Sequence, residues 1–319
     1  MNNNTRQPAI AVEGLHKKYG DKVVLDGVDL TVDRGSVYAL LGPNGAGKTT
    51  IVNILSTLIR FDGGRVEVAG HDVVAEPDAV RAAIGVTGQF SAIDNLLTGE
   101  ENLMLMADLH HLPRMEGQRR VEELLRRFDL VEAREQIPAT YSGGMQRRLD
   151  LAMGLIGSPH VVFLDEPTTG LDPRGRHTVW QSIRKLAAED VTVFLTTQYL
   201  EEADRLADRI ALLDEGRIVA EGTPPELKRL VPGGHISLHF DDPGQLESAA
   251  SVLAPMARDD GQLTLDVPSD GGVASIREVL DSLDRHSLEV GSLTVHTPDL
   301  DDVFFALTGR VATEEVPTP

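Results

Sequence analysis

The chain has 319 residues, of which 41% are hydrophobic, so it is long enough for one large or two ordinary domains with a sizeable buried core. No run of about 18 apolar residues occurs, and residues 1–8 lack the apolar stretch of a signal peptide, so no membrane-spanning helix is expected. The formal net charge of −20 disfavours nucleic acid as a partner, and the absence of cysteine excludes disulfides and thiolate metal sites.

The first part of the chain has the pattern of an α/β domain. Residues 9–12 and 28–32 look like strands of an antiparallel edge. Residues 37–41 are continuously apolar and end in a glycine-rich turn, after which residues 51–59 have helical spacing. Residues 161–164 and 191–195 are further apolar runs, as expected of strands buried on both faces. We therefore expect a mostly parallel central sheet flanked by helices.

Between about residues 90 and 159 the pattern changes to helices, with candidates at 100–112 and 118–128 and a third that opens at Ser142. This segment is predicted to be a helical insertion within the α/β domain. His110 and His111 are expected to lie solvated on a polar helix face rather than to bind a metal.

A loop signal, Val-Pro-Gly-Gly at residues 231–234, indicates a domain boundary. Two later segments alternate between apolar and polar residues, and residues 276–283 have helical spacing. We expect a large domain at 8–231, a small α+β domain at 232–309, and a disordered tail at 310–319 that is rich in Glu, Thr and Pro.

Residues 42–49 read Gly-Pro-Asn-Gly-Ala-Gly-Lys-Thr, which matches the phosphate-binding pattern G-x-x-x-x-G-K-[ST] in full. Glycines let backbone N–H groups surround phosphates, and the start of the following helix adds partial positive charge. Lys48 is suited to the β- and γ-phosphates, and the Thr49 hydroxyl is suited to Mg²⁺. An ordinary glycine-rich turn is the alternative, but the strand before it and the helix after it argue against that. The predicted nucleotide contacts here are Gly42, Pro43, Asn44, Gly45, Ala46, Gly47, Lys48, Thr49 and Thr50.

Asp165 and Glu166 end the apolar run that begins at Val161. Asp165 is suited to hold Mg²⁺ through its water shell, and Glu166 is suited to polarise an attacking water as general base. Such a pair alone indicates only a solvated loop. Together with a complete phosphate loop it predicts a nucleotide-hydrolysing site.

Residues 141–148 read Tyr-Ser-Gly-Gly-Met-Gln-Arg-Arg and precede Asp165. With this segment the chain resembles the ATP-binding cassette (ABC) family, whose L-S-G-G-Q signature occurs in the same order. Gln89 matches the family's Q-loop, Leu171-Asp172 its D-loop, and Tyr19 the aromatic residue that stacks on adenine. The resemblance covers about residues 8–230 and identifies them as a nucleotide-binding domain.

The resemblance implies ATP and Mg²⁺ as ligands and a homodimer in which each ATP lies between Lys48 of one copy and Ser142 of the partner subunit. Ser142 is a good N-cap, and Gly143 and Gly144 expose backbone donors at a helix start. The resemblance assigns Gln89, Ser142, Gly143, Gly144 and Asp172 to the nucleotide, and Thr49, Gln89 and Asp165 to the metal.

Two features depart from the family pattern. Tyr141 and Met145 replace the usual Leu and Gln of the signature, and Gln198 stands where a switch histidine is usual. Gln198 can donate a hydrogen bond to a γ-phosphate, but it cannot take up a proton and become charged. A histidine-centred mechanism therefore does not carry over. Hydrolysis with Glu166 as base is still expected, and Lys48 and Gln198 are the further candidate catalytic residues.

Residues 141–145, 197–204 and 300–309 narrow the resemblance to the daunorubicin/doxorubicin-resistance ATP-binding subunits of antibiotic exporters. This implies an ATPase at the cytoplasmic face of the membrane that energises a separate permease, which exports a hydrophobic drug-like compound or lipid. Residues 300–309 have one apolar face, which fits either packing or binding of a partner.

Two other functions remain open. One is a non-transport ABC ATPase acting on ribosomes or DNA, against which the single cassette, the lack of long heptads and the acidic charge argue. The other is a regulatory module with little turnover, which Met145 and Gln198 favour and the intact Lys48, Asp165 and Glu166 oppose.

Overall fold

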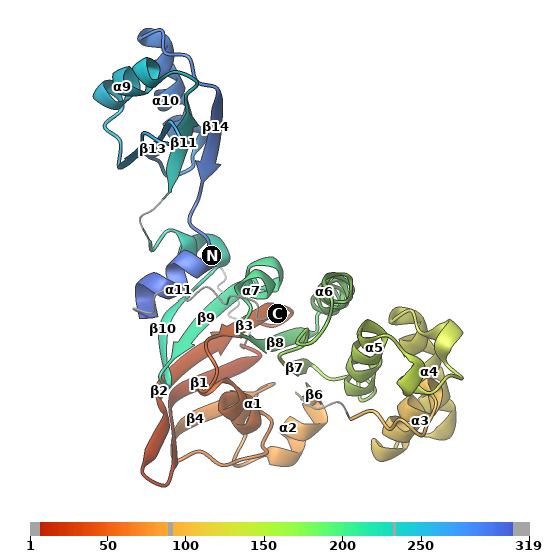
Figure 1. Ribbon diagram of the computed structural model, residues 1–319. Coiled ribbons are helices and arrows are strands. Elements are labelled where there is room, and N and C mark those ends of the chain that lie inside the picture. Colours follow the sequence, from red (N-terminus) through yellow and green to blue (C-terminus); the bar gives the residue numbers. More distant parts are fainter. Residues whose placement is uncertain (1–6, 89–91, 232–233, 309–319) are drawn as a thin grey trace, which may run out of the picture. The chain divides into compact units, whose positions relative to one another are not determined.

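The computed structural model describes residues 7–88, 92–231 and 234–308. The chain forms two compact units, residues 1–224 and 225–319 (Figure 1). The division falls before the loop at 231–234 that the sequence indicates. No helix among the described residues combines the length and the apolar character that crossing a membrane requires.

A six-stranded sheet forms the centre of the first unit, in the order β10-β9-β3-β8-β7-β6. Its strands are parallel except β10, which pairs antiparallel with β9. Every residue of β3, β7 and β8 is buried, which explains their continuous apolar sequences and confirms the predicted parallel sheet. The strands are β3 (Val37–Leu41), β6 (Ile84–Thr87), β7 (Val161–Asp165), β8 (Thr192–Thr197), β9 (Arg209–Asp214) and β10 (Arg217–Gly222).

The predicted antiparallel strands form a separate sheet rather than an edge of the central one, in the order β2-β1-β4-β5. They are β1 (Ile10–Tyr19), β2 (Lys22–Val32), β4 (Gly63–Val68) and β5 (His71–Asp72). Register shifts interrupt the pairing of β1 with β2. Buried residues therefore alternate regularly with less buried ones only near the start of β1 and near the end of β2. Buried residues of both sheets share one core, which includes Ile10, Leu30, Phe163 and Leu213.

Helix α1 (Lys48–Leu55) lies in this same core through Ile51, Ile54 and Leu55. It starts and ends earlier than the predicted range of 51–59, because Ser56 caps it and Thr57 follows with φ of 64°. The other described helices of the first unit outside the insertion are α2 (Pro77–Ala83), α6 (Pro173–Ala188) and α7 (Leu200–Leu206).

The predicted helical insertion lies between β6 and β7 and contains α3, α4 and α5, which Figure 1 shows grouped beyond those two strands. Ser142 caps α5 as expected. His110 and His111 are exposed as predicted, but they follow α3 instead of lying on its face, because the helix ends at Leu109. The segments are α3 (Gly99–Leu109), α4 (Arg114–Arg127), η1 (Val131–Ala133), η2 (Pro138–Thr140) and α5 (Gly143–Gly154).

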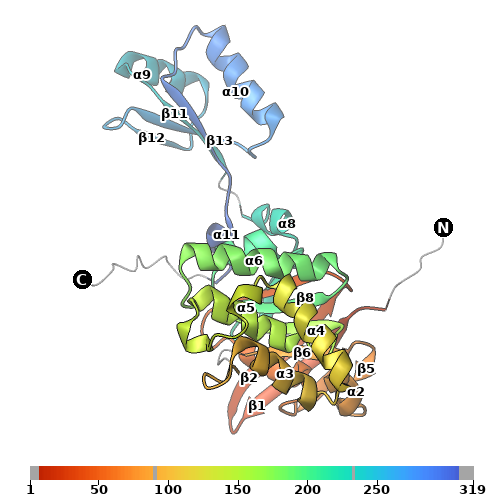
Figure 2. The same cartoon turned by 90° about the vertical axis from the view of Figure 1, so that its right-hand side faces the viewer.

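The second unit contains an antiparallel sheet in the order β12-β13-β11-β14. Ile236 and Leu238 of β11 and Leu265 of β13 pack with α9 and α10, which cover one face of the sheet (Figure 2). The alternating pattern arises because the other face carries polar residues. The elements are α8 (Pro224–Lys228), β11 (His235–His239), α9 (Pro243–Val252), β12 (Ala257–Asp259), β13 (Thr264–Pro268), α10 (Val273–Arg285), β14 (Ser292–His296) and α11 (Leu300–Thr308). The predicted tail at 310–319 lies outside the described residues.

Candidate functional site

Three neighbouring strands of the central sheet bring the predicted phosphate residues together. In β3, Leu41 pairs with Thr197 of β8, and Thr196 of β8 pairs with Asp165 of β7. Because these strands are parallel, their carboxyl ends share one edge of the sheet, where ligands of open α/β sheets bind. The phosphate loop follows β3, Asp165 and Glu166 lie at the end of β7, and Gln198 follows β8.

The phosphate loop is held in a form that only glycine permits at two positions. Gly47 has φ of 113°, and a Cβ added there would come within 2.7 Å of a methyl group of Leu25. A Cβ on Gly42 would lie 2.2 Å from the carbonyl oxygen of Leu213. Gly47 is also the N-cap of α1 and forms no side-chain cap, so the first N–H groups of the helix are available to an anion.

Lys48 is buried and lies within this loop. Its Nζ donates hydrogen bonds to the carbonyl oxygens of Gly42, at 2.7 Å, and Pro43, at 3.0 Å. Burial lowers the pKa of Lys48, and the negative charges of Glu166 and Asp165 oppose that shift. Both of these acceptors are neutral, and a phosphate oxygen would give the ammonium group a charged acceptor in their place.

Asp165 links the phosphate loop to the end of β8. Its Oδ2 accepts a hydrogen bond from Thr49 Oγ1 at 3.0 Å, and its Oδ1 accepts one from the Thr196 hydroxyl. A hydroxyl and a carboxylate oxygen are the hard ligands that Mg²⁺ prefers. Among the described residues no group of three His, Cys, Asp or Glu side chains could hold a metal. The Thr49–Asp165 pair therefore fits an ion that keeps water and phosphate as its other ligands.

Glu166 has a left-handed backbone conformation with φ of 48°. Its N–H bonds to the Thr196 carbonyl oxygen at 3.1 Å and to the Thr196 Oγ1 at 3.2 Å. Its carboxylate accepts a hydrogen bond from Thr169 Oγ1 at 3.2 Å.

The signature residues lie in a different hollow from the phosphate loop. Ser142 caps α5 by accepting a hydrogen bond from the Met145 N–H at 3.3 Å. Asp172 caps α6 in the same way, with the Gly175 N–H at 2.7 Å. The two helix starts line one cavity of about 430 Å³, and none of its residues belongs to the phosphate loop. Its lining includes Ser142, Gly143, Gly144, Gly170, Leu171, Asp172 and Gly175.

Tyr141, one of the departures from the family signature, has a structural explanation. Its side chain is buried, and its hydroxyl donates a hydrogen bond to the Ala133 carbonyl oxygen at 2.6 Å. A Cβ on Gly99 would lie 2.3 Å from this hydroxyl oxygen, so Gly99 makes room for it. Leucine could not form this hydrogen bond.

Tyr19 lies at the end of β1 and is 53% exposed, with Lys17 Nζ 5.1 Å from the centre of its ring. The strand that follows, β2, contacts the phosphate loop, since Leu25 lies against Gly47. Gln89 lies outside the described residues.

Thr196, Arg147 and Glu202 make contacts that no motif in the sequence predicts. Thr196 bonds to both Asp165 and Glu166, and its polar side chain at the end of an apolar run was a signal that could have been used. Glu202 is buried and accepts hydrogen bonds from the Thr168 hydroxyl at 2.8 Å and the Trp180 indole at 3.0 Å. No pattern along the chain pairs these residues.

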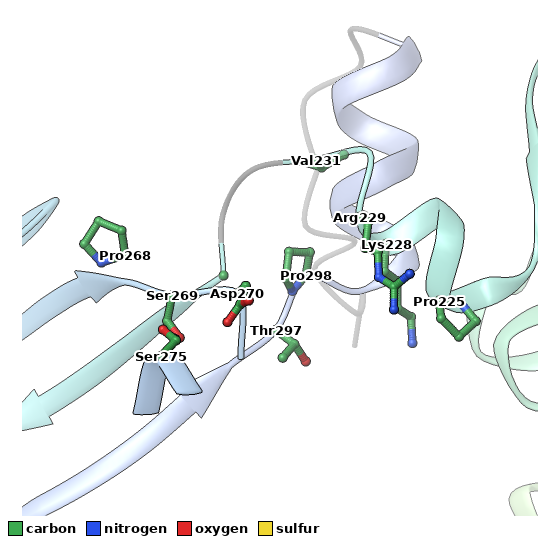
Figure 3. Close-up of a pocket in the computed structure, with 11 residues that line it drawn as sticks. Pro225, Lys228, Arg229, Val231, Pro268, Ser269, Asp270, Ser275, Thr297 and Pro298 are labelled. Carbon is green, nitrogen blue, oxygen red and sulfur yellow. The ribbon is translucent and has the colours of Figure 1, made fainter. Parts of the chain in front are cut away.

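A larger cavity, of about 760 Å³, lies in the second unit (Figure 3). Lys228 and Arg229 line it together with Ser269 and Ser275, whose hydroxyl oxygens are 2.7 Å apart. None of its lining residues belongs to the phosphate loop, the signature or the β7 carboxylates. The larger volume is therefore no reason to move the candidate nucleotide site from the first unit.

Known proteins share both this fold and these sequence features. Residues 25–169 match the family described as ABC transporter. A daunorubicin resistance ATP-binding protein of Streptomyces coeruleorubidus is 50% identical, covering 94% of this chain and 96% of that protein. A Nod factor export ATP-binding protein of Ralstonia nicotianae is 37% identical, covering 95% of this chain and 94% of that protein.

A solved structure of an ATP-binding subunit of an ABC transporter is 31% identical, with a TM-score of 0.62, and covers 70% of this chain and 92% of that one. This match confirms the predicted fold class. With half of its residues identical to a relative over nearly its whole length, the chain belongs to the ABC transporter family, among its ATP-binding proteins.

Proposed function

We propose that the chain hydrolyses ATP, with Mg²⁺, to energise export through a separate membrane permease. The observation that carries the proposal is the 3.0 Å hydrogen bond between Thr49 of the phosphate loop and Asp165 at the end of β7. It supports a shared role in metal binding for two residues 116 positions apart in the sequence. Lys48, next to Thr49, and Glu166, next to Asp165, complete the set.

Each of these residues has a chemical role in the proposal. Lys48 exchanges the carbonyl oxygens of Gly42 and Pro43 for phosphate oxygens, and the free N–H groups at the start of α1 bind the same phosphates. Thr49 and Asp165 hold Mg²⁺, which neutralises phosphate charge when bound. Glu166 polarises the attacking water, and Gln198 donates a hydrogen bond to the γ-phosphate.

A second copy of the chain completes the site in this proposal. The hollow that contains Ser142 and Asp172 is separate from Lys48, which supports a site whose two halves come from two copies of the chain. The N–H groups of Gly143 and Gly144 at the start of α5 suit the γ-phosphate of an ATP held by the partner. Tyr19, exposed at the end of β1, is assigned to the adenine, and Gln89 to the metal and the permease.

The transport role is supported by the names of the relatives, which include daunorubicin resistance and Nod factor export. We infer a peripheral subunit at the cytoplasmic face of the membrane and a cargo that is a hydrophobic drug-like compound or a lipid. Closing and reopening of the dimer with ATP binding and hydrolysis would drive the permease. We assign the second unit to pairing with a second copy of the chain or with the permease.

Glu166→Gln tests the hydrolytic site, because glutamine keeps the shape of the side chain and cannot act as base. Phosphate release from ATP should fall by about 10²–10⁴-fold. ATP binding should persist, and an ATP-bound dimer should accumulate in size-exclusion chromatography. Lys48→Ala is the matched comparison: it should lose turnover together with most nucleotide binding, since it removes the cation at the phosphates.

Normal turnover in Glu166→Gln would show that another group is the base, and normal turnover in Lys48→Ala would remove the phosphate assignment altogether. The transport role is tested by purification from native membranes. A membrane protein with spanning helices should accompany the chain, whereas a ribosomal or DNA-bound complex in its place would contradict export.

A further inference from the structure

Arg147 of α5 has an unusual set of hydrogen-bond partners. Its Nε donates to the Pro167 carbonyl oxygen at 2.8 Å, and its Nη2 donates to the Asp165 carbonyl oxygen at 3.3 Å. Its Nη1 donates to the Gly88 carbonyl oxygen at 3.3 Å and to Asp150 Oδ2 at 2.8 Å. The guanidinium group thus joins α5 to two other segments of the chain.

Both segments lie beside residues of the proposed site. Asp165 and Pro167 are the two neighbours of Glu166, so Arg147 holds the backbone on both sides of the proposed base. Gly88 precedes residues 89–91, and Ala92, which follows them, donates its N–H to Asp150 Oδ1 at 3.3 Å. Arg147 and Asp150 together therefore contact both flanks of that segment.

The pair is buried, since the side chains of Arg147 and Asp150 are 12% and 5% exposed. Burial lowers the pKa of Arg147, and the charges of Asp150, Glu202 and Asp165 oppose that shift. An arginine remains charged nevertheless, so the fold desolvates a cation here. Apolar residues in place of a buried ion pair often give a protein equal or greater stability. The Arg147–Asp150 pair is therefore better explained by a role in positioning than by a role in stability.

We propose that Arg147 and Asp150 are positioning residues that couple the helical insertion to the hydrolytic loop. A movement of α5 is passed through the guanidinium group to the backbone on either side of Glu166 and to Gly88 at the same time. The inference rests on the proposed hydrolysis at Glu166 and deepens it. Arg147 and Asp150 line one cavity with Glu166, and in this proposal both act through Glu166 instead of binding the nucleotide.

Arg147→Gln tests this coupling, with kcat, ATP affinity and melting temperature measured on the full chain. We expect kcat to fall by about 10- to 100-fold, because the base is misplaced, while the Kd for ATP changes by less than about threefold. Arg120→Gln is the matched control. Arg120 is also largely buried in the insertion and donates to the Leu155 carbonyl oxygen at 2.9 Å and to Glu123, and both partners lie outside the hydrolytic loop. Arg120→Gln should lower the melting temperature but leave kcat close to the wild-type value.

A double variant separates positioning from general stability. If Arg147 acts through Glu166, Arg147→Gln should lower the residual single-turnover rate of Glu166→Gln by less than about threefold, since the base is already gone. An equal loss in both backgrounds would overturn the inference.

Arg147→Lys covers the case in which Arg147→Gln fails to fold. Lysine keeps a charge beside Asp150 but lacks the planar guanidinium group that spans three segments. It should fold and lose kcat, and wild-type kcat in Arg147→Lys would also overturn the inference.

These outcomes are distinct from failure of the proposed function. If the wild-type chain does not hydrolyse ATP, or Glu166→Gln hydrolyses it normally, the proposed function fails and the coupling fails with it. If Glu166→Gln is inactive while Arg147→Gln keeps wild-type kcat, only the coupling fails.

Discussion

Gln198 is the residue at which this chain departs most clearly from the chemistry of its family pattern. It is half-buried and follows β8, whose Thr197 carbonyl oxygen accepts a hydrogen bond from the Gly42 N–H at 3.3 Å. This contact ties the start of the phosphate loop to the residue before Gln198. A neutral amide at this place can donate a hydrogen bond to a phosphate but cannot carry charge.

We predict that Gln198→Ala lowers kcat by about 10- to 100-fold, the effect of losing one hydrogen bond to a charged group. Gln198→His should keep most of the activity, because an imidazole can supply the same donor. Steady-state phosphate release measures both. Equal activity of Gln198→Ala and the wild-type chain would show that Gln198 has no γ-phosphate role.

Helix α7 is joined to its neighbours by the carboxylate of Glu202. Thr168, in the loop after β7, and Trp180 of α6 both donate to its Oε1. The same helix begins two residues after Gln198. A single buried side chain thus holds together the loop that follows Glu166, helix α6 and the helix next to Gln198.

Burial raises the pKa of Glu202 above its ordinary value of 4.5, although hydrogen bonds from Thr197, Thr168 and Trp180 and the charge of Arg147 oppose the shift. The folded chain therefore binds this proton more tightly than the unfolded chain does. Its contribution to stability is present at low pH and is lost as the pH rises from about 4.5 through the folded pKa.

We predict that the melting temperature of Glu202→Gln increases relative to wild type as the pH is raised from about 4.5 to 7. Glutamine can still accept the hydrogen bonds from Thr168 and Trp180 at its carbonyl oxygen and has no charge to bury. Thermal unfolding over this pH range measures the difference. Glu201→Gln, an exposed neighbour in the same helix, controls for the loss of one negative charge. The same pH trend in both variants would contradict a role for burial at Glu202.

The residues assigned to the nucleotide and those assigned to pairing with a partner lie in different units of the molecule. Every described residue that we assign to the nucleotide lies in the first unit. In the second unit, Leu300 and Val303 of α11 are buried, whereas Phe304 and Phe305 are only half-buried, with ring centres 5.8 Å apart. Half-exposed aromatic residues are typical of contacts with a partner.

We predict that a chain ending at Val231 binds ATP nearly as well as the full chain but pairs less stably with a second copy or with the permease. ATP titration, thermal unfolding and co-purification from membranes, all on this one truncated chain, measure the three properties. A chain ending at Thr308 keeps every described element of the second unit and serves as the control.

The alternative is that the second unit only covers apolar surface. In that case solubility and melting temperature fall together, with no selective loss of assembly. A stable truncated chain that still assembles fully would rule out the assembly role.

The sequence by itself determined the features that depend on neighbours along the chain. The phosphate loop, the Ser142 cap and the buried strands β3, β7 and β8 are each set by a short run of residues, because backbone geometry, capping and burial on both faces act locally. The family pattern supplied the order of these motifs, and with it the fold class.

Only the tertiary structure decided which distant residues meet. Strands β1 and β2 form their own sheet because register shifts and pairing with β4 set their partners. Arg147 reaches Gly88, Asp165 and Pro167, and Glu202 reaches Thr168 and Trp180, because folding brings separate segments to one buried place. A buried charge must find its partners in three dimensions, and no spacing along the chain records which ones they are.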